Sequence, residues 1–381
     1  MENNRLIIWG NYFGFMVMGM IVISFGATMP YIRREFTLTF EQGGLILAIF
    51  SASYLINGLI SGILVDGIGH KWVLLIGNAG YILGLLILAS SNCLVTIYFG
   101  VLVLGLGWGF CNSVVNILVN DSSEGDSKAM SLLHMSFGVG AFVVPLLFNG
   151  LLMIGFTWKH LMFILALMAL IAEIIAIKMK IPFIKPMRQN DNHRIKLPWR
   201  YIIIYMFILF FYVGVENAFS GWMVSYLETG LNFSEGFSQG LLSTLWLTMI
   251  FGRFATGTFG RKMDKAKYLV CVSFTAFLGM FIFWLSTSEV WIALSVICIG
   301  LSLAGIYPLT IADANRHIRG SGVATAIVIS GGGIGATIMP YLTGKVADRY
   351  GAIAIISSIL VSIVFMFFFT ALNWRQQKTR I

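Results

Sequence analysis

Ionisable side chains inside long apolar runs could carry proton chemistry in this chain. The clearest are Glu173, Glu216 and Arg253, and His134 lies just inside the start of its run. A charged group at the centre of a membrane helix costs about 2.5–3.5 kcal/mol on insertion scales, so each of these residues is a functional candidate. A carboxylate held away from water can bind and release a proton near neutral pH, and imidazole titrates in the same range.

A second set of residues suits the recognition of a neutral polar molecule. Trp108, Asn112 and Asn116 recur every four residues, which places them in one stripe along a helix. Amides can hydrogen-bond sugar hydroxyls and an indole can pack against C–H groups; the alternative is that these side chains only join neighbouring helices. Tyr307 precedes Pro308, which predicts a helix kink. The other candidate contacts for a solute are Asn11, Tyr54, Asn57, Asn217, Trp222 and Trp246.

The composition excludes soluble enzymes, disordered chains and disulfide scaffolds. Of the 381 residues, 58% are hydrophobic and 11% are charged, against about 45–50% and about 25% in soluble domains. The net charge of +9 comes from basic residues in short gaps between apolar runs, so no nucleic-acid partner is expected. The chain has no HExxH motif, and its glycine-rich segment 331–335 lacks the lysine of a phosphate loop. We therefore expect no enzyme activity, no cofactor and no metal site.

Apolar runs long enough to cross a bilayer supply the elements that position these residues. A membrane helix needs roughly 20 apolar residues. Twelve runs meet this requirement, at residues 6–31, 43–65, 72–90, 95–119, 129–153, 159–178, 199–227, 237–258, 268–287, 290–313, 321–343 and 352–373. If the N-terminus is cytoplasmic, 19 of the 25 Lys and Arg residues fall on the cytoplasmic side. The bias predicts that both termini are cytoplasmic.

An internal repeat relates the two halves of the chain. At an offset of 195 residues eight glycines coincide with glycines, including Gly19 with Gly214 and Gly140 with Gly335. One constant offset through ten runs indicates two halves of the same construction. We predict an all-helical membrane protein of twelve transmembrane helices in two pseudo-symmetric six-helix bundles. The expected bundles are residues 1–178 and 199–381, and residues 179–198 form a cytoplasmic linker.

The chain resembles the major facilitator superfamily over nearly its whole length. After the second run it keeps Gly62, Asp66, Gly69 and Lys71 of the superfamily's signature loop, and departs from it at two other positions, Gly67 and His70. Within the superfamily it is similar to the fucose–galactose–glucose:proton symporters, on the segments 134–145, 212–227 and 246–253. The resemblance implies a permease of the cytoplasmic membrane for sugars or similar polar solutes, coupled to protons or sodium.

The resemblance also implies roles for single residues. Glu216 lies on a helix expected to line the central cavity, so we expect it to couple proton binding to transport; the alternative is a structural carboxylate. Asp66 is expected near the start of the eleventh helix as a gating residue, or else is an ordinary loop aspartate. Arg253 is a gate or lipid anchor, or contacts the solute, and its different depth argues against a static pair with Glu216. His134 either relays protons or hydrogen-bonds a neighbouring helix, and Glu173 is expected to reach the membrane surface or an ion pair.

The function that we predict is secondary active transport of a small polar solute, a monosaccharide or related neutral compound, by alternating access. Coupling to protons through Glu216 is expected, with sodium coupling or uncoupled transport left open because the first and fourth runs contain no carboxylate. The alternative is an efflux carrier for drugs or apolar metabolites, favoured by 14% aromatic content and 19 methionines. A membrane sensor on a transporter fold is a third possibility. We expect a monomeric protein of a bacterial cytoplasmic membrane, in contact with lipid.

Overall fold

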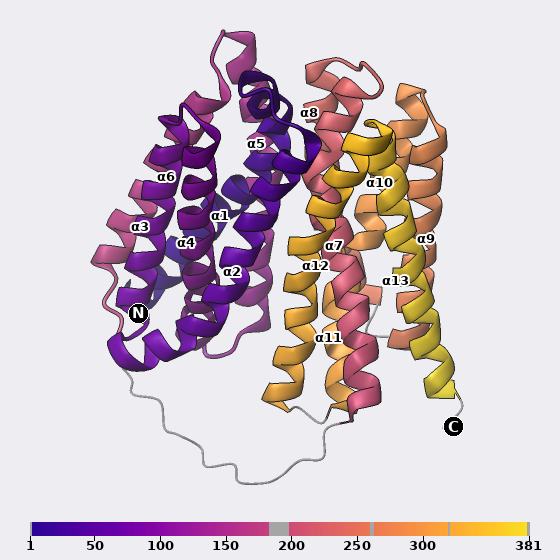
Figure 1. The fold of residues 1–381 in the computed structure, drawn as a ribbon. Coiled ribbons are helices and arrows are strands. Elements are labelled where there is room, and N and C mark those ends of the chain that lie inside the picture. Colours follow the sequence, from indigo (N-terminus) through magenta and orange to yellow (C-terminus); the bar gives the residue numbers. More distant parts are fainter. Residues whose placement is uncertain (1, 183–197, 260–262, 319–320, 379–381) are drawn as a thin grey trace. The chain divides into compact units, whose positions relative to one another are not determined.

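The computed structural model describes residues 2–182, 198–259, 263–318 and 321–378, and in these ranges it contains thirteen helices and no strand (Figure 1). Helices are expected in a lipid bilayer, because each helix forms the hydrogen bonds of its own backbone N–H and C=O groups. In the first half they are α1 (Glu2–Glu35), α2 (Phe40–Ile68), α3 (His70–Ala89), α4 (Leu94–Ser122), α5 (Ser127–Met153) and α6 (Trp158–Lys178). In the second half they are α7 (Trp199–Thr229), α8 (Glu235–Phe259), α9 (Lys265–Leu285), α10 (Glu289–Leu303), α11 (Ile306–His317), α12 (Gly322–Tyr350) and α13 (Ala354–Lys378).

The helices confirm the predicted all-helical membrane fold. Within the described ranges, ten helical segments are long and apolar enough to cross a membrane, or eleven if the bent α2 is one span. The predicted number of twelve is therefore not reached by length and composition alone: α8, at the eighth predicted run, is not among these segments. α10 and α11 count as one span with a break after Leu303. This interruption lies just before Pro308, which has no N–H for the carbonyl of Ala304; the kink itself stays a prediction.

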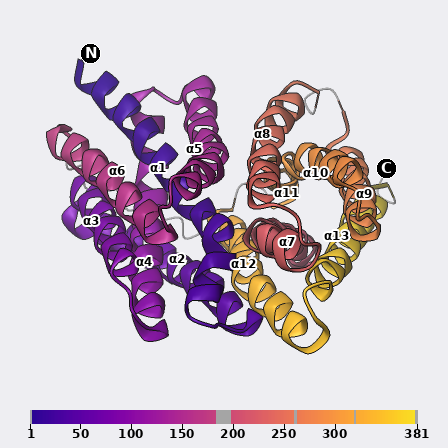
Figure 2. The ribbon, with the colours of Figure 1, turned by 90° about the horizontal axis from the view of Figure 1, so that it is seen from above.

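The contacts between residues divide the chain into two compact units. The first contains residues 1–38 and 46–191, and the second contains residues 39–45 and 192–381. Most of the predicted linker, residues 183–197, lies outside the described residues. Figure 2 shows α1 beside α5 in the first unit and α7 beside α12 in the second, and both pairs are in close contact.

Glycines at equivalent positions of the repeat make these close contacts. A methyl group on Gly19 or Gly140 would overlap a backbone carbonyl of the facing helix, that of Phe137 or Met16. The equivalent glycines in the second unit behave alike, since a methyl group on Gly335 would overlap the carbonyl of Phe210 and one on Gly214 would meet Met339. The 195-residue offset thus marks the same α1–α5 and α7–α12 packing in both units.

Candidate functional site

Glu216 lies in a polar group of the second unit. Its half-buried side chain on α7 is within hydrogen-bonding reach of the Tyr212 hydroxyl one turn away, and the charge of Arg253 on α8 acts on it. The ring of Tyr307 on α11 lies 6.4 Å from that of Tyr212. The structure therefore brings three candidates from three helices, Glu216, Arg253 and Tyr307, around Tyr212. That Arg253 and Glu216 do not form a static pair stays a prediction.

The other candidates of the second unit are engaged in helix packing. Trp222 is fully buried, and its indole N–H donates to the Pro340 carbonyl at 2.9 Å. Trp246 is also buried, at 3% exposure. The Asn217 amide donates to the Val213 carbonyl of its own helix at 2.9 Å and stays half-buried. Of these three, only Asn217 retains exposed surface that a solute could contact.

In the first unit an aromatic and amide cluster forms where α2 meets α4. The Trp108 ring stacks on two rings of α2, Tyr54 at 4.0 Å and Phe50 at 4.9 Å between centroids. The Asn112 amide donates to the Tyr54 hydroxyl at 3.3 Å, and the Asn116 amide donates to the Asn112 carbonyl at 2.7 Å. Apart from buried Phe50, all members of this cluster are half-buried. The predicted stripe on the fourth run thus exists, and Tyr54 extends it.

Two further candidates of the first unit act as contacts between or within helices. The buried Asn57 amide of α2 donates to the Leu106 carbonyl of α4. Asn11, 2% exposed, donates to the Ile7 carbonyl at 2.7 Å and approaches the Met179 sulfur at 4.0 Å. Neither amide is directed toward the cluster around Trp108.

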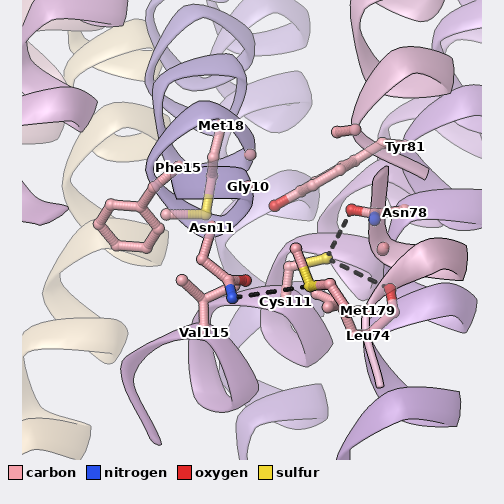
Figure 3. A pocket seen from close by; sticks show the side chains of 13 residues that line it. Gly10, Asn11, Phe15, Met18, Leu74, Asn78, Tyr81, Cys111, Val115 and Met179 are labelled. Carbon is pink, nitrogen blue, oxygen red and sulfur yellow. Dashed lines mark hydrogen bonds between the residues drawn. The ribbon is translucent and has the colours of Figure 1, made fainter. Parts of the chain in front are cut away.

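Asn11 instead lines a small pocket among α1, α3, α4 and α6 (Figure 3). The pocket has room for about one water molecule. Beside it the Cys111 thiol donates to the Asn78 side-chain oxygen at 3.4 Å. The pocket is too small for a sugar.

Glu173 differs from its expectation. We predicted that this residue of α6 extends to the membrane surface or an ion pair. The structure instead turns its carboxylate inward, within hydrogen-bonding reach of Asn78 on α3, and buries one of its oxygens. That prediction is wrong. Glu173 lies one helical turn from Ala169 and Ala176, which are buried, so it is on the face of α6 that points toward α3.

His134 and Asp66 are placed without a tested role. The exposed His134 ring on α5 lies 5.6 Å from that of Phe15 on α1, in an edge-to-face contact. Asp66 is exposed near the end of α2. Their relay and gating roles stay predictions.

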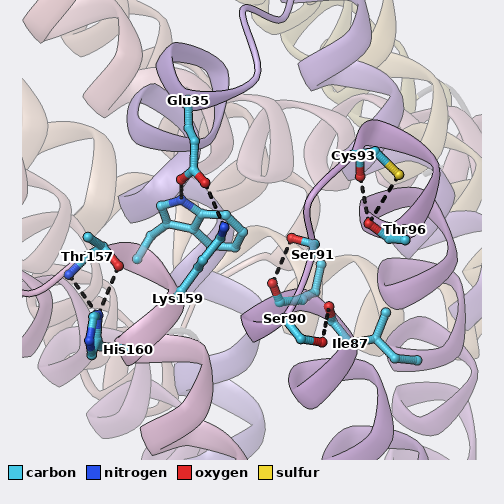
Figure 4. Close-up of polar contacts among 11 residues, drawn as sticks. Glu35, Ile87, Ser90, Ser91, Cys93, Thr96, Thr157, Lys159 and His160 are labelled. Carbon is cyan, nitrogen blue, oxygen red and sulfur yellow. Dashed lines mark hydrogen bonds and ion pairs between the residues drawn. The ribbon is translucent and has the colours of Figure 1, made fainter.

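The ends of the helices in the first unit are joined by polar contacts (Figure 4). Glu35, at the end of α1, accepts a hydrogen bond from the Trp158 indole at 2.6 Å and pairs with Lys159 at 2.7 Å. These two contacts attach α1 to the start of α6. Also in Figure 4, the Thr96 hydroxyl donates to the Cys93 carbonyl at 2.7 Å, at the start of α4.

Sequence reasoning missed two aspartates of the second unit. Asp313 on α11 is 1% exposed and accepts several hydrogen bonds. Asp348, near the end of α12, accepts from the backbone N–H groups of Phe40 and Glu41 at 2.6 and 2.7 Å, and so caps α2. The pairing of Asp313 with His317 four residues later was the available signal for the first. No sequence pattern indicates the role of Asp348, because its partners are some 300 residues away in sequence.

A serine motif typical of hydrolases also occurs by chance. Residues 236–240 read Gly-Phe-Ser-Gln-Gly. Ser238 lies in the first turns of α8, is fully buried and donates to the Ser234 carbonyl at 3.0 Å. A nucleophilic serine needs an exposed turn between a strand and a helix, so this segment supports no hydrolase.

Comparison with known proteins identifies the family. Residues 12–340 match the model of the Major Facilitator Superfamily. The glucose/mannose transporter GlcP of Bacillus subtilis is 25% identical over 351 residues, which cover 87% of this chain and 86% of GlcP. The sodium-dependent glucose transporter 1A of Mus musculus is 23% identical over 402 residues, covering 93% and 94%. Protein TsgA of Escherichia coli is 22% identical over 376 residues, covering 97% and 95%.

Solved structures agree on the fold. A mutant of the nucleoside transporter NupG superposes with a TM-score of 0.81 at 13% identity, over 97% of this chain and 98% of NupG. A bacterial homolog of the human lysosomal transporter Spinster gives 0.75 at 12% identity, over 99% and 96%. Because the family model spans most of the helices, the chain belongs to the Major Facilitator Superfamily and is a multi-pass membrane transporter.

Proposed function

We propose that this protein is a secondary transporter of a monosaccharide or a related neutral polar solute, and that it works by alternating access. The observation that carries the proposal is the cluster of Tyr54, Trp108 and Asn112, where a stacked aromatic surface adjoins an amide and a hydroxyl, all half-buried. Such a surface matches the alternating C–H and O–H faces of a sugar. Two relatives similar over most of their length carry the names of glucose transporters, which supports the same solute class.

We further propose that Glu216 binds the coupling proton. Its carboxylate is partly exposed, neighbours Tyr212 and lies within reach of the Arg253 charge. Protonation would remove the negative charge that Arg253 attracts, and would change how α7 and α8 hold each other. This change supplies the link between proton binding and helix movement that a symporter needs.

The test is uptake into proteoliposomes that contain the purified protein. We expect radiolabelled glucose or another hexose to accumulate when a pH gradient, acidic outside, is imposed. Glu216→Gln should abolish this accumulation and leave exchange of labelled for unlabelled solute intact. The matched control is Glu235→Gln, at the exposed start of α8.

The remaining outcomes each decide something. Accumulation driven by a sodium gradient alone would refute proton coupling and agree with the name of the mouse relative. Wild-type accumulation by Glu216→Gln would refute the role of this residue. Export of apolar dyes without any hexose uptake would favour the efflux alternative over the sugar transporter.

The orientation and the membrane are also proposals. The distribution of Lys and Arg places both termini in the cytoplasm. The matches to bacterial relatives support a bacterial cytoplasmic membrane, and we propose that the protein works there as a monomer.

A further inference from the structure

A buried carboxylate of the second unit has no part in the function proposed so far. Asp313 on α11 is 1% exposed. One of its oxygens, Oδ2, accepts hydrogen bonds from the Tyr205 hydroxyl of α7 at 2.8 Å, and from Asn373 and Gln377 of α13, both at 2.9 Å. Three helices thus converge on one carboxylate oxygen through neutral donors.

His317 extends this cluster toward the end of α11. Its Nδ1 lies 3.0 Å from the Asp313 backbone carbonyl and 3.0 Å from the Tyr205 oxygen. A carbonyl only accepts, so this geometry assigns the proton to Nδ1. The Tyr205 O–H is directed to Asp313, so its oxygen accepts from the same Nδ1–H, which it shares with the Asp313 carbonyl, and from Gln377 at 3.4 Å. The result is a continuous chain of donors from the imidazole through the tyrosine to the carboxylate.

Among the described residues around this cluster, no Lys or Arg side chain reaches the Asp313 carboxylate. From α7, Tyr201 stacks on the His317 ring at 4.5 Å between centroids. From α9, the Lys265 ammonium donates to the Ala312 carbonyl at 3.4 Å, and does not reach the carboxylate. α13 contributes the two neutral amides. Among the described residues no Lys or Arg forms an ion pair with Asp313, and the group at the other end of its hydrogen-bond chain is the His317 imidazole.

The same two helices connect this cluster to Glu216. Tyr205 and Tyr212 are seven residues apart on α7, and therefore lie on one face. Tyr307 and Asp313 stand on the facing helix α11, where Tyr307 lies 6.4 Å from Tyr212 and Asp313 bonds Tyr205. α7 and α11 thus face each other in two layers, one beside Glu216 and one toward the start of α7 and the end of α11. The predicted topology puts these two helix ends on the cytoplasmic side.

We propose that Asp313, Tyr205 and His317 form a proton relay that exchanges a proton with the cytoplasm. A proton from water binds Nε2 of His317. The Nδ1 proton then moves to the Tyr205 oxygen while the Tyr205 hydroxyl proton moves to Asp313, which leaves His317 neutral with its proton on Nε2. One proton has entered and Asp313 holds it; the reverse sequence releases it. The proposal rests on the proton coupling proposed above and adds the residues that exchange that proton with the cytoplasm.

The test compares variants that break the relay with one that breaks only a hydrogen bond. In proteoliposomes, Asp313→Asn and Tyr205→Phe should lose accumulation driven by a pH gradient while solute exchange continues, and His317→Gln should change the dependence of accumulation on internal pH. Gln377→Ala is the matched control, because it removes a contact of the same length to the same oxygen and a longer one, of 3.4 Å, to the Tyr205 oxygen, but no transferable proton. It should accumulate solute with the wild-type pH profile. Equal loss in Gln377→Ala and Asp313→Asn would mean a purely structural cluster and would overturn the relay.

Infrared difference spectroscopy of purified protein separates this proposal from that for Glu216. A pH jump should give a carboxylic acid band that Asp313→Asn removes and that persists in Glu216→Gln. If wild-type protein shows no pH-driven uptake but keeps this band, proton coupling fails and Asp313 still exchanges protons. If Asp313→Asn leaves the spectrum and the pH profile unchanged, the relay is refuted whatever the outcome for Glu216.

Discussion

A methyl group placed on Gly140 tests the packing that both units share. In the α1–α5 contact the added carbon would overlap the Met16 carbonyl, and backbone cannot move aside as a flexible side chain can. Overfilling a packed interior costs about 1–3 kcal/mol. Alanine itself favours a helix interior over glycine by about 0.5–1 kcal/mol. Gly150→Ala on the same helix has only this gain, because nothing lies within 4 Å of the added carbon.

The stabilities of the two alanine variants should therefore differ from that of the wild type in opposite directions. Gly140→Ala should be less stable than Gly150→Ala by about 1–3 kcal/mol, the cost of overfilling, because the helix gain is common to both variants. For units of this size that is on the order of 2–12 °C in the midpoint of thermal unfolding. Gly335→Ala, the equivalent of Gly140 in the second unit, should behave like Gly140→Ala, because its methyl group overlaps the Phe210 carbonyl.

The assay is thermal unfolding of purified variants in detergent, followed by tryptophan fluorescence and size-exclusion chromatography. Equal midpoints for Gly140→Ala and Gly150→Ala would show that the α1–α5 contact is looser than the structure has it. A normal midpoint for Gly335→Ala alone would mean that the repeat of sequence is not a repeat of packing.

Three more outcomes follow from the structure. Asp348→Ala removes two short hydrogen bonds to the start of α2 and should lower the free energy of unfolding by about 0.5–2 kcal/mol; an unchanged midpoint would refute this cap. The hydrogen bonds of Thr96, first its backbone N–H and then its hydroxyl, lower the pKa of the exposed Cys93 thiol, so the reactive thiolate persists to lower pH than in an ordinary cysteine. A membrane-impermeant maleimide should label Cys93 from outside the cell, and more slowly after Thr96→Ala; labelling only after lysis would reverse the proposed orientation. Trp108→Ala should weaken hexose binding by about tenfold, since stacking contributes about 1.5 kcal/mol, and wild-type affinity in equilibrium binding would contradict the sugar site.

The sequence predicts the framework of this protein much better than its polar contacts. Apolar length and the 195-residue glycine offset depend only on local composition and on the repeat, and the α1–α5 and α7–α12 contacts follow both. The stripe through Asn112 also follows from helix periodicity, and the structure contains it. The direction of Glu173 could not be read in this way, because it depends on how α6 is rotated against α3.

The missed aspartates show a second limit. Asp313 stood at the margin of an apolar run, where charged residues are ordinary, and only the convergence of α7 and α13 makes it buried and bonded. The prediction for Trp222 differs in the opposite direction. An aromatic residue on the same helix as Glu216 suggests a binding surface, yet α12 buries the Trp222 ring and the Pro340 carbonyl accepts its N–H. Both outcomes depend on contacts between residues 60 to 118 positions apart in sequence, for which the chain offers no local signal.

The repeat also separates what the two units share from what they do not. At the same offset that aligns the glycines, Glu216 corresponds to Ile21 and Asp313 corresponds to Leu118, both buried apolar residues. The proposed solute contact shows the reverse pattern: Trp108 of the first unit corresponds to the apolar Leu303 of the second unit. Duplication therefore supplied two copies of one backbone packing, while the ionisable residues of the proposed proton path were placed in the second copy and the aromatic and amide cluster in the first. The two proposals assign the solute to the first unit and the proton to the second, so the coupling that they propose needs a conformational change that involves both units.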